Sequence, residues 1–261
     1  MHGLGNDFVV LDGREQSIPI DPATVRALAD RRTGIGCDQL IMIGRSAVAD
    51  VSMRIWNSDG SEVGACGNAT RCIPVLLDRD CTIETPAGVL HATREEGGAV
   101  VDMGRPSFDW ESIPLAYAMD TAALPLAWDA LERPMAVNLG NPHLVFFVAD
   151  IDAIPLEELG PRIEADPLFP ERINVNVAQI VDRRHIRART WERGAGLTRA
   201  CGTGACATAV AAIISGRADR PVTVELPGGQ LTIGWTPGGA ITMAGPAAHV
   251  FSGEITLPVP A

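Results

Sequence analysis

The sequence predicts an α+β fold made of two homologous, strand-rich halves, each a β-barrel-like sheet wrapped round a central helix, with a pseudo-two-fold axis relating the halves. Three observations support this prediction. Short segments recur at a fixed spacing, most patterned segments have the character of strands, and one helix follows the repeated segment in each half. The 261 residues, 46% of them hydrophobic, suffice for two domains of about 100–150 residues each.

The repeat is the strongest of these observations. Three tripeptides recur 135 residues later, and a fourth segment recurs at an offset of 141, so the second copy has gained six residues. The matching segments are 4–6 with 139–141, 54–56 with 189–191, 65–67 with 200–202, and 84–90 with 225–231. We therefore expect residues 1–107, with residues 247–261 packed back on them, to form the first half and residues 108–246 to form the second.

The predicted elements are mostly strands. Each strand segment is short, rich in β-branched or apolar residues and bounded by Gly, Asp or Pro. These segments are residues 8–11, 40–43, 51–56, 99–103, 144–148, 186–191, 222–226 and 231–235. Three helices are expected: residues 22–31 with Asp21 as the N-cap, one after Cys66, and one after Cys201 that runs to Ile214. The last helix is apolar on every side, which predicts that sheet surrounds it.

The composition excludes several classes of function. A net charge of −11 argues against a nucleic-acid partner. No apolar run approaches the roughly 18–20 residues that span a bilayer, and no secretory signal is visible, so we expect no membrane partner and a cytoplasmic location. The 21 residues counted as Lys or Arg are all arginines, so no lysine is present to form a Schiff base with pyridoxal phosphate.

The six cysteines are expected to be free thiols. In a cytosolic chain of this size they do not indicate a disulfide framework, and without a Cys-x-x-Cys pair we expect no zinc and no other metal. Most of them are interpreted as packing thiols, namely Cys37, Cys72, Cys81 and Cys206. Cys66 and Cys201 differ, because each stands before a glycine and a predicted helix at the same place in the repeat.

Cys66 and Cys201 are therefore the candidate catalytic residues. The free amides and the dipole at a helix N-terminus favour negative charge, so a thiol there is expected to have a lowered pKa and to react as the thiolate. The same amides suit a carboxylate ligand. Two equivalent thiols fit the inversion of a stereocentre, in which one group removes a proton from one face and the other returns a proton on the opposite face.

These motifs resemble those of the diaminopimelate epimerase family, over nearly the whole chain. The resemblance rests on MHGLGNDF at 1–8, NSDGS at 57–61, CGN at 66–68, GNPH at 140–143, ERGAG at 192–196 and ACGTGAC at 200–206. It implies a cofactor-independent isomerase that interconverts LL-diaminopimelate and meso-diaminopimelate, in lysine and peptidoglycan precursor biosynthesis. It also implies a homodimer, with Phe251 at a dimer contact where some members have Tyr.

The resemblance further implies roles for individual residues. Cys201 takes the α-proton from the LL isomer, and Cys66 gives a proton on the other face. His143 and Glu192 support catalysis, and Arg193 suits the distal carboxylate of the substrate because a guanidinium binds a carboxylate in bidentate fashion. The implied substrate-binding residues are Asn6, Gln39, Asn57, Gly67, Asn68, Asn141, Asn174, Glu192, Arg193, Gly202 and Thr203.

Three other functions are compatible with parts of the sequence pattern. The nearest alternative is a proline or hydroxyproline racemase of the same two-thiol architecture, although these enzymes tend to carry His where this chain has Asn68, and they lack the Glu192–Arg193 pair. A non-catalytic small-molecule binding protein would need neither cysteine. A redox protein that pairs Cys66 with Cys201 is disfavoured by the missing Cys-x-x-Cys spacing.

Overall fold

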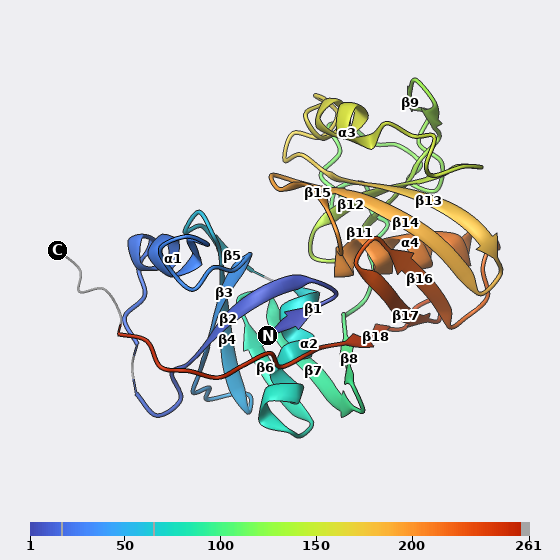
Figure 1. The fold of residues 1–261 in the computed structure, drawn as a ribbon. Helices are drawn as coiled ribbons and strands as arrows, with labels where there is room; N and C mark the ends of the chain where they lie inside the picture. The colour runs from blue at the N-terminus through green and yellow to red at the C-terminus, as the bar shows by residue number, and fades with distance from the viewer. Residues whose placement is uncertain (17, 65, 257–261) are drawn as a thin grey trace. The chain divides into compact units, whose positions relative to one another are not determined.

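Two units make up the fold. The computed structural model describes residues 1–16, 18–64 and 66–256 (Figure 1). Unit 1 consists of Met1–Val101 together with the chain from Gly245 onward, and unit 2 consists of Asp102–Ala244. The boundaries expected from the sequence fall at 107/108 and 246/247. Residues 257–261, which are expected to belong to the first half, lie outside the described residues.

Backbone hydrogen bonds explain where the boundaries fall. The Met103 amide donates to the Ile241 carbonyl, and the Ile241 amide donates to Gly104, both at 2.8 Å, so the chain already belongs to the second unit at residue 103. In the first unit, Ala248 exchanges two backbone hydrogen bonds with His2, at 2.9 and 3.0 Å. The C-terminal segment thus packs on the N-terminal strand.

Unit 1 is a twisted sheet with two helices. Its strands are β1 (His2–Gly3), β2 (Asn6–Asp12), β3 (Gln39–Gly44), β4 (Val51–Asn57), β5 (Glu62–Val63), β6 (Cys81–Thr85), β7 (Gly88–Glu95) and β8 (Gly98–Asp102). They follow the order β1-β2-β3-β4-β6-β7-β8, with β5 paired to β4. The helices are α1 (Pro22–Ala29) and α2 (Gly67–Leu77), and α2 contacts β1, β6 and β7.

Unit 2 has the same plan. Its strands are β9 (Ala127–Trp128), β10 (Leu131–Glu132), β11 (Met135–Asn138), β12 (Pro142–Phe147), β13 (Asn174–Asp182), β14 (His185–Glu192), β15 (Gly196–Thr198), β16 (Val222–Leu226), β17 (Gly229–Trp235) and β18 (Ile241–Pro246). The main sheet runs β18-β17-β16-β14-β13-β12-β11, with β15 paired to β14. The helices are α3 (Leu156–Glu164) and α4 (Gly202–Ile214).

The central helix of unit 2 is buried as the sequence predicts. Helix α4 contacts β11, β12, β13, β14, β16 and β17 (Figure 1), and its residues from Gly204 to Ala212 are all buried. Small side chains let the strands approach it on every side. The prediction that sheet surrounds this helix is therefore confirmed.

The strand registers reproduce the sequence repeat. In unit 1, Phe8 lies opposite Gln39, and in unit 2 His143 lies opposite Asn174, which are the residues 135 positions later. The pairs between β4 and β5 and between β14 and β15 follow the same offset. After α4 the offset becomes 141, because the residue pairs between β16 and β17 lie 141 positions after the equivalent pairs between β6 and β7. The α+β class with two homologous, strand-rich halves is confirmed.

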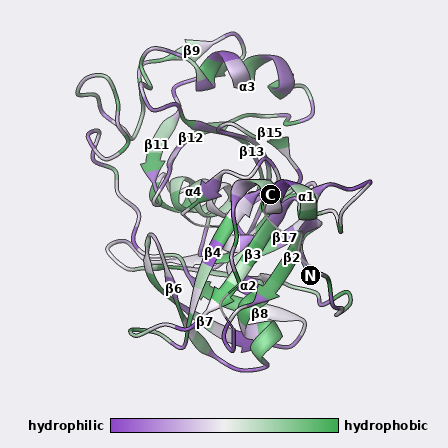
Figure 2. Cartoon of the chain, turned by 90° about the vertical axis from the view of Figure 1, so that its left-hand side faces the viewer, coloured by the Kyte–Doolittle hydropathy of each residue, from purple (hydrophilic) through white to green (hydrophobic). Residues whose placement is uncertain are grey.

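The outer helices differ from expectation. Helix α1 begins where predicted, with the Asp21 carboxylate accepting from the Thr24 amide at 2.7 Å, but it ends at Ala29. It stops there because the Asp30 carboxylate accepts from the amides of Arg32 and Thr33 and thereby forms a turn. Helix α3 is not predicted from the sequence. Its residues are both hydrophilic and hydrophobic (Figure 2), and Gly160 and Pro161, which are poor helix formers, interrupt the helical pattern. No helix among the described residues is both long and apolar enough to cross a membrane.

Candidate functional site

The first half-site lies at the N-terminus of α2. Cys66 is the N-cap residue of this helix, and Gly67 and Asn68 form its buried first turn. The Cys66 thiol donates to Asn6 Oδ1 at 3.9 Å, and Asn68 Nδ2 donates to the same oxygen at 3.4 Å. The structure thus brings four of the predicted site residues together, from β2 and from α2.

A buried arginine supports this turn. Arg71 is completely buried, and its guanidinium donates to Asn68 Oδ1 at 2.9 Å and to the Gly67 carbonyl at 3.4 Å. It also donates to the carbonyl of Pro246 at 3.4 Å, so the same side chain ties α2 to the C-terminal segment. Arg71 is not among the residues predicted from the sequence.

Gln39 and Asn57 form a second cluster of unit 1. They lie opposite each other on β3 and β4, and Gln39 Nε2 donates to Asn57 Oδ1 at 3.0 Å. Asn57 Nδ2 donates to Ser61 at 3.1 Å in the turn that leads to β5. The Gln39 Oε1 atom is buried and has no hydrogen-bond partner among the described residues, which leaves an acceptor for a ligand.

The second half-site lies at the N-terminus of α4. Cys201 is the N-cap residue and is 5% exposed, and its sulfur accepts from the Gly204 amide at 3.3 Å. The Thr203 hydroxyl lies 3.5 Å from the same sulfur, and Gly202 is buried in the first turn between them. The predicted lowering of the thiol pKa is wrong here, because burial and the neighbouring Glu192 carboxylate raise the pKa of Cys201 well above its usual value.

Asn141, the residue before β12, and His143, on β12, extend this half-site. Asn141 Nδ2 donates to Thr203 Oγ1 at 3.3 Å, and His143 Nε2 lies 3.0 Å from Asn141 Oδ1. His143 is fully buried, and burial, together with the positive charge of Arg193, lowers its pKa to about 3. The imidazole is therefore neutral at physiological pH. Sequence reasoning missed Asn176, whose Nδ2 lies 3.2 Å from His143 Nδ1.

The turn between β14 and β15 carries Glu192 and Arg193. The Thr198 hydroxyl donates to the Glu192 carboxylate, and burial raises the pKa of that carboxyl. Asn174 Oδ1 accepts from the Arg193 amide at 2.9 Å, and Asn174 Nδ2 donates to the Pro142 carbonyl at 2.8 Å. The exposed Arg193 guanidinium donates to the carbonyl of Glu171 at 2.9 Å. Both predicted side chains therefore stand on a turn held by Asn174.

A buried glutamate, also missed from the sequence, holds the same turn. Glu164 Oε2 accepts from the Trp191 indole at 2.7 Å, and Oε1 accepts from the Gly194 amide at 3.0 Å. The unit 1 counterpart, 135 residues earlier, is Ala29. The signal that could have identified Glu164, Asn176 and Arg71 is a polar residue in one copy of the repeat where the other copy has an apolar one.

The remaining cysteines pack in the interior. All six cysteines lie within the described residues, and none forms a disulfide. Cys37, Cys72, Cys81 and Cys206 are buried, as predicted. Burial raises the pKa of Cys72 to about 12 and that of Cys81 to about 11, so both stay protonated at physiological pH. Within the described residues, no group of three or more His, Cys, Asp or Glu side chains is arranged to hold a metal ion.

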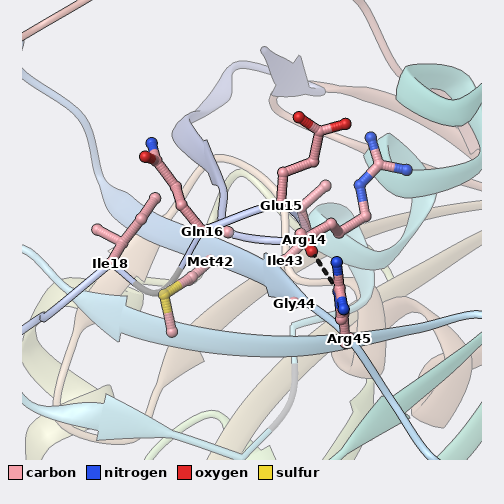
Figure 3. Close-up of a pocket in the computed structure, with 9 residues that line it drawn as sticks. Arg14, Glu15, Gln16, Ile18, Met42, Ile43, Gly44 and Arg45 are labelled. Atoms are coloured by element: carbon pink, nitrogen blue, oxygen red, sulfur yellow. Dashed lines mark hydrogen bonds between the residues drawn. The ribbon is translucent and has the colours of Figure 1, made fainter.

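A separate pocket of unit 1, of about 400 Å³, lies beside the loop that follows β2 (Figure 3). Its lining residues are Gly13, Arg14, Glu15, Gln16, Ile18, Met42, Ile43, Gly44 and Arg45. Arg45 Nε closes part of it by donating to the Arg14 carbonyl at 2.6 Å. The predicted site residues do not line this pocket, and it is not assigned to the same function.

Comparison with solved structures identifies the class of fold. The chain is similar to a PhzF-family phenazine biosynthesis protein of Bacillus anthracis, with a TM-score of 0.71 and 19% identity over 98% of this chain and 95% of that one. It is also similar to a probable proline racemase of Agrobacterium radiobacter with bound carbonate, with a TM-score of 0.69 and 17% identity over 98% and 92% of the two chains. At these identities the likeness shows the fold alone.

Comparison with sequences identifies the family. The Diaminopimelate epimerase family profile matches residues 1–108 and 135–250. A diaminopimelate epimerase of Rhizorhabdus wittichii is 63% identical over 98% of this chain and 94% of that protein. A diaminopimelate epimerase of Sphingopyxis alaskensis is 60% identical over 97% of this chain and 95% of that protein. The chain belongs to the diaminopimelate epimerase family.

Proposed function

We propose that the chain interconverts LL-diaminopimelate and meso-diaminopimelate by two-base proton transfer at the α-carbon, in lysine and peptidoglycan precursor biosynthesis. One observation carries the proposal: each half begins its central helix with a thiol at the same place in the repeat, Cys66 before Gly67 and Cys201 before Gly202. The family relatives named diaminopimelate epimerase, which are isomerases acting on an amino acid, support the choice of reaction.

The reaction needs one thiolate and one thiol at the same time. In the LL-to-meso direction the Cys201 thiolate removes the α-proton, and the Cys66 thiol delivers its proton to the opposite face. The reverse direction exchanges these roles. Because the chain has no lysine, it cannot form a Schiff base with pyridoxal phosphate to take up the electron pair left on the α-carbon. The proposed reaction is therefore cofactor-independent.

The helix N-termini stabilise the charge that develops. The first-turn amides, from Gly67 and Asn68 and from Gly202 and Thr203, are the donors assigned to the α-carboxylate. At the distal end Arg193 is assigned to the second carboxylate, and Asn174 and Glu192 to an ammonium group. Asn6, Gln39, Asn57 and Asn141 are assigned to the remaining polar contacts of the substrate. His143 is neutral and supports Asn141 rather than exchanging a proton itself.

Turnover measurements on matched variants test this proposal. Purified protein is given LL- or meso-diaminopimelate, and the isomers are separated by chiral chromatography. The wild-type protein should reach the same equilibrium mixture of isomers from either starting isomer. In Cys66→Ser and Cys201→Ser, kcat should fall at least about a hundredfold, because a serine hydroxyl is a much weaker acid than a thiol. L-Proline and hydroxyproline test the racemase alternative and should not be converted. Unchanged turnover in either serine variant would overturn the assignment.

We also infer a homodimer in the cytoplasm. Phe251 and Val250 are 68% and 61% exposed, so two neighbouring apolar side chains stand on the surface where a partner chain can cover them. Six cysteines that form no disulfide with one another fit a reducing compartment. Light scattering after size exclusion should give a dimer for wild type and a monomer for Phe251→Asp. A monomeric wild type would contradict the inference.

A further inference from the structure

Two buried polar side chains lie behind the second half-site. Asn176 on β13 is 0% exposed and Thr190 on β14 is 2% exposed. The first half has Ile41 and Ile55 at the equivalent positions, 135 residues earlier. Burying a polar group is unfavourable unless it is hydrogen-bonded. The two isoleucines show that the same sheet can form with apolar side chains at these positions, so the fold alone does not require polar ones.

Geometry fixes the orientation of the Asn176 amide. Nδ2 donates to the Leu144 carbonyl at 2.8 Å, and a carbonyl oxygen can only accept. The Oδ1 atom accepts from the Thr190 hydroxyl at 2.9 Å, which holds the amide from its other end. The second proton on Nδ2 is therefore directed at His143 Nδ1, 3.2 Å away.

This orientation decides the tautomer of His143. A neutral imidazole carries one proton, and a nitrogen that accepts a hydrogen bond does not carry it. Because Nδ1 accepts from Asn176, the proton of His143 is on Nε2, and it points at Asn141 Oδ1, 3.0 Å away.

The direction of donation continues to the sulfur. With its carbonyl occupied by His143, Asn141 presents Nδ2 to the Thr203 hydroxyl oxygen at 3.3 Å. The Thr203 hydroxyl proton is then free to point at Cys201 Sγ, 3.5 Å away. Thr190, Asn176, His143, Asn141 and Thr203 form a hydrogen-bond chain in which each member donates toward the thiol.

We propose that Asn176 and Thr190 are positioning residues of the second half-site, which hold His143 as its Nε2–H tautomer and so direct this chain of donors at the Cys201 sulfur. The consequence is that Cys201 receives donors from Thr203 and Gly204, the arrangement that favours a thiolate over a thiol. These bonds oppose the effect of burial and of Glu192 on the thiol. The inference rests on the proposed function only for the use made of that thiolate.

The first test is spectroscopic and needs no substrate. In protein with ¹⁵N-labelled histidine, the ring nitrogens of His143 report which of them carries the proton, and a His143→Gln spectrum assigns the signals. Wild type should show a protonated Nε2 and an unprotonated Nδ1. A protonated Nδ1 would overturn the proposal.

The second test measures the thiolate fraction of Cys201. Its alkylation by iodoacetamide at pH 8 is followed by peptide mass spectrometry, because only the thiolate reacts. Thr190→Val and Asn176→Ile should slow alkylation about threefold and tenfold respectively. Simple loosening of the fold would instead expose Cys201 and speed alkylation, so the direction of the change separates positioning from packing.

Matched controls complete this test. Thr190→Ser keeps the hydroxyl and should alkylate like wild type. Thr208→Val removes another fully buried hydroxyl of the same unit, which has no hydrogen-bond partner among the described residues, and should also leave alkylation unchanged. Unchanged or faster alkylation in Thr190→Val and Asn176→Ile would overturn the proposal. If wild type failed to interconvert diaminopimelate isomers while both tests gave the expected results, the proposed function would fail and this inference would stand.

Discussion

Asn6 and Asn141 occupy equivalent positions of the repeat but present opposite ends of their amides to the two half-sites. Asn6 Nδ2 donates to the Asp38 carboxylate at 3.1 Å, so its carbonyl oxygen faces the Cys66 thiol. Asn141 uses its carbonyl to accept from His143, so its amino group faces Thr203 beside Cys201. An acceptor favours a protonated sulfur and a donor favours a thiolate. The two half-sites therefore differ in hydrogen-bond polarity, although burial and Glu192 still raise the pKa of Cys201.

The orientation of Asn6 is expected to depend on Asp38. Asp38→Ala removes the acceptor that holds the Asn6 amino group, so the amide can turn over and direct a donor at Cys66. We expect kcat/KM for both isomers to fall about tenfold, which corresponds to about 1.4 kcal/mol of transition-state stabilisation. Steady-state kinetics measure this. Asp152→Ala, which removes an exposed partner of Arg187, is the control and should have no effect.

Glu164 is expected to stabilise the turn that carries Glu192 and Arg193. Glu164→Ala leaves the Trp191 indole and the Gly194 amide without their acceptor and should lower the free energy of unfolding by about 2–4 kcal/mol. Urea denaturation measures the loss. Glu157→Ala, on the same helix but with an exposed carboxylate, should cost less than about 1 kcal/mol. Equal effects of the two substitutions would show that the buried contacts do not hold the turn.

Arg71 is expected to hold the first turn of α2 in its binding geometry. Arg71→Met keeps much of the aliphatic volume but removes the donors to Gly67 and Asn68, which should raise KM about tenfold and destabilise the protein by about 3 kcal/mol. The exposed Arg79 provides the comparison, and Arg79→Met should change both quantities little. A wild-type KM in Arg71→Met would limit the residue to a role in stability.

Buried thiols are expected to make the protein less stable at high pH. The folded protein keeps the proton of Cys72 up to a pKa of about 12, whereas the unfolded chain releases it near its usual value, about 8.5. Between these values the folded state binds more protons, so stability falls as pH rises, by up to about 1.4 kcal/mol per pH unit from this thiol. Urea denaturation at pH 8 to 10.5 should show a shallower decline for Cys72→Ala. An unchanged slope would contradict the assignment.

The sequence alone predicts the duplicated architecture because the repeat survives in residues that the fold requires. Gly5 and Gly140 match at the offset of 135, and both adopt a positive φ, 83° and 90°, that other residues rarely tolerate. The two Cys-Gly pairs match for a similar reason, since each starts a buried helix. Helix α3 was not predictable in the same way, because Gly160 and Pro161 weaken its helical pattern and its contact with Trp191 depends on tertiary structure.

The residues assigned to the substrate are predictable from the family resemblance, whereas the residues that support them from behind are not. Asn176, Thr190 and Glu164 act through other side chains, and their roles depend on which atoms they meet across the sheet. The pKa of Cys201 is the clearest case. Its place at the N-terminus of α4 predicts a lowered pKa, but burial and Glu192, at the end of β14, dominate and raise it. The signature of Asn176, Thr190 and Glu164 in the sequence is a polar residue in the second copy of the repeat where the first copy has an apolar one.

The central claim is that two different groups exchange the α-proton, and isotope incorporation at the start of the reaction tests it most directly. LL-diaminopimelate is incubated in heavy water, and both isomers are analysed by mass spectrometry while little product has formed. Removal by Cys201 and delivery by a deuterated Cys66 predict that the new meso isomer carries one deuterium while the remaining LL isomer carries almost none. Extensive deuterium in the recovered LL isomer, or a meso product that retains the original proton, would contradict the account.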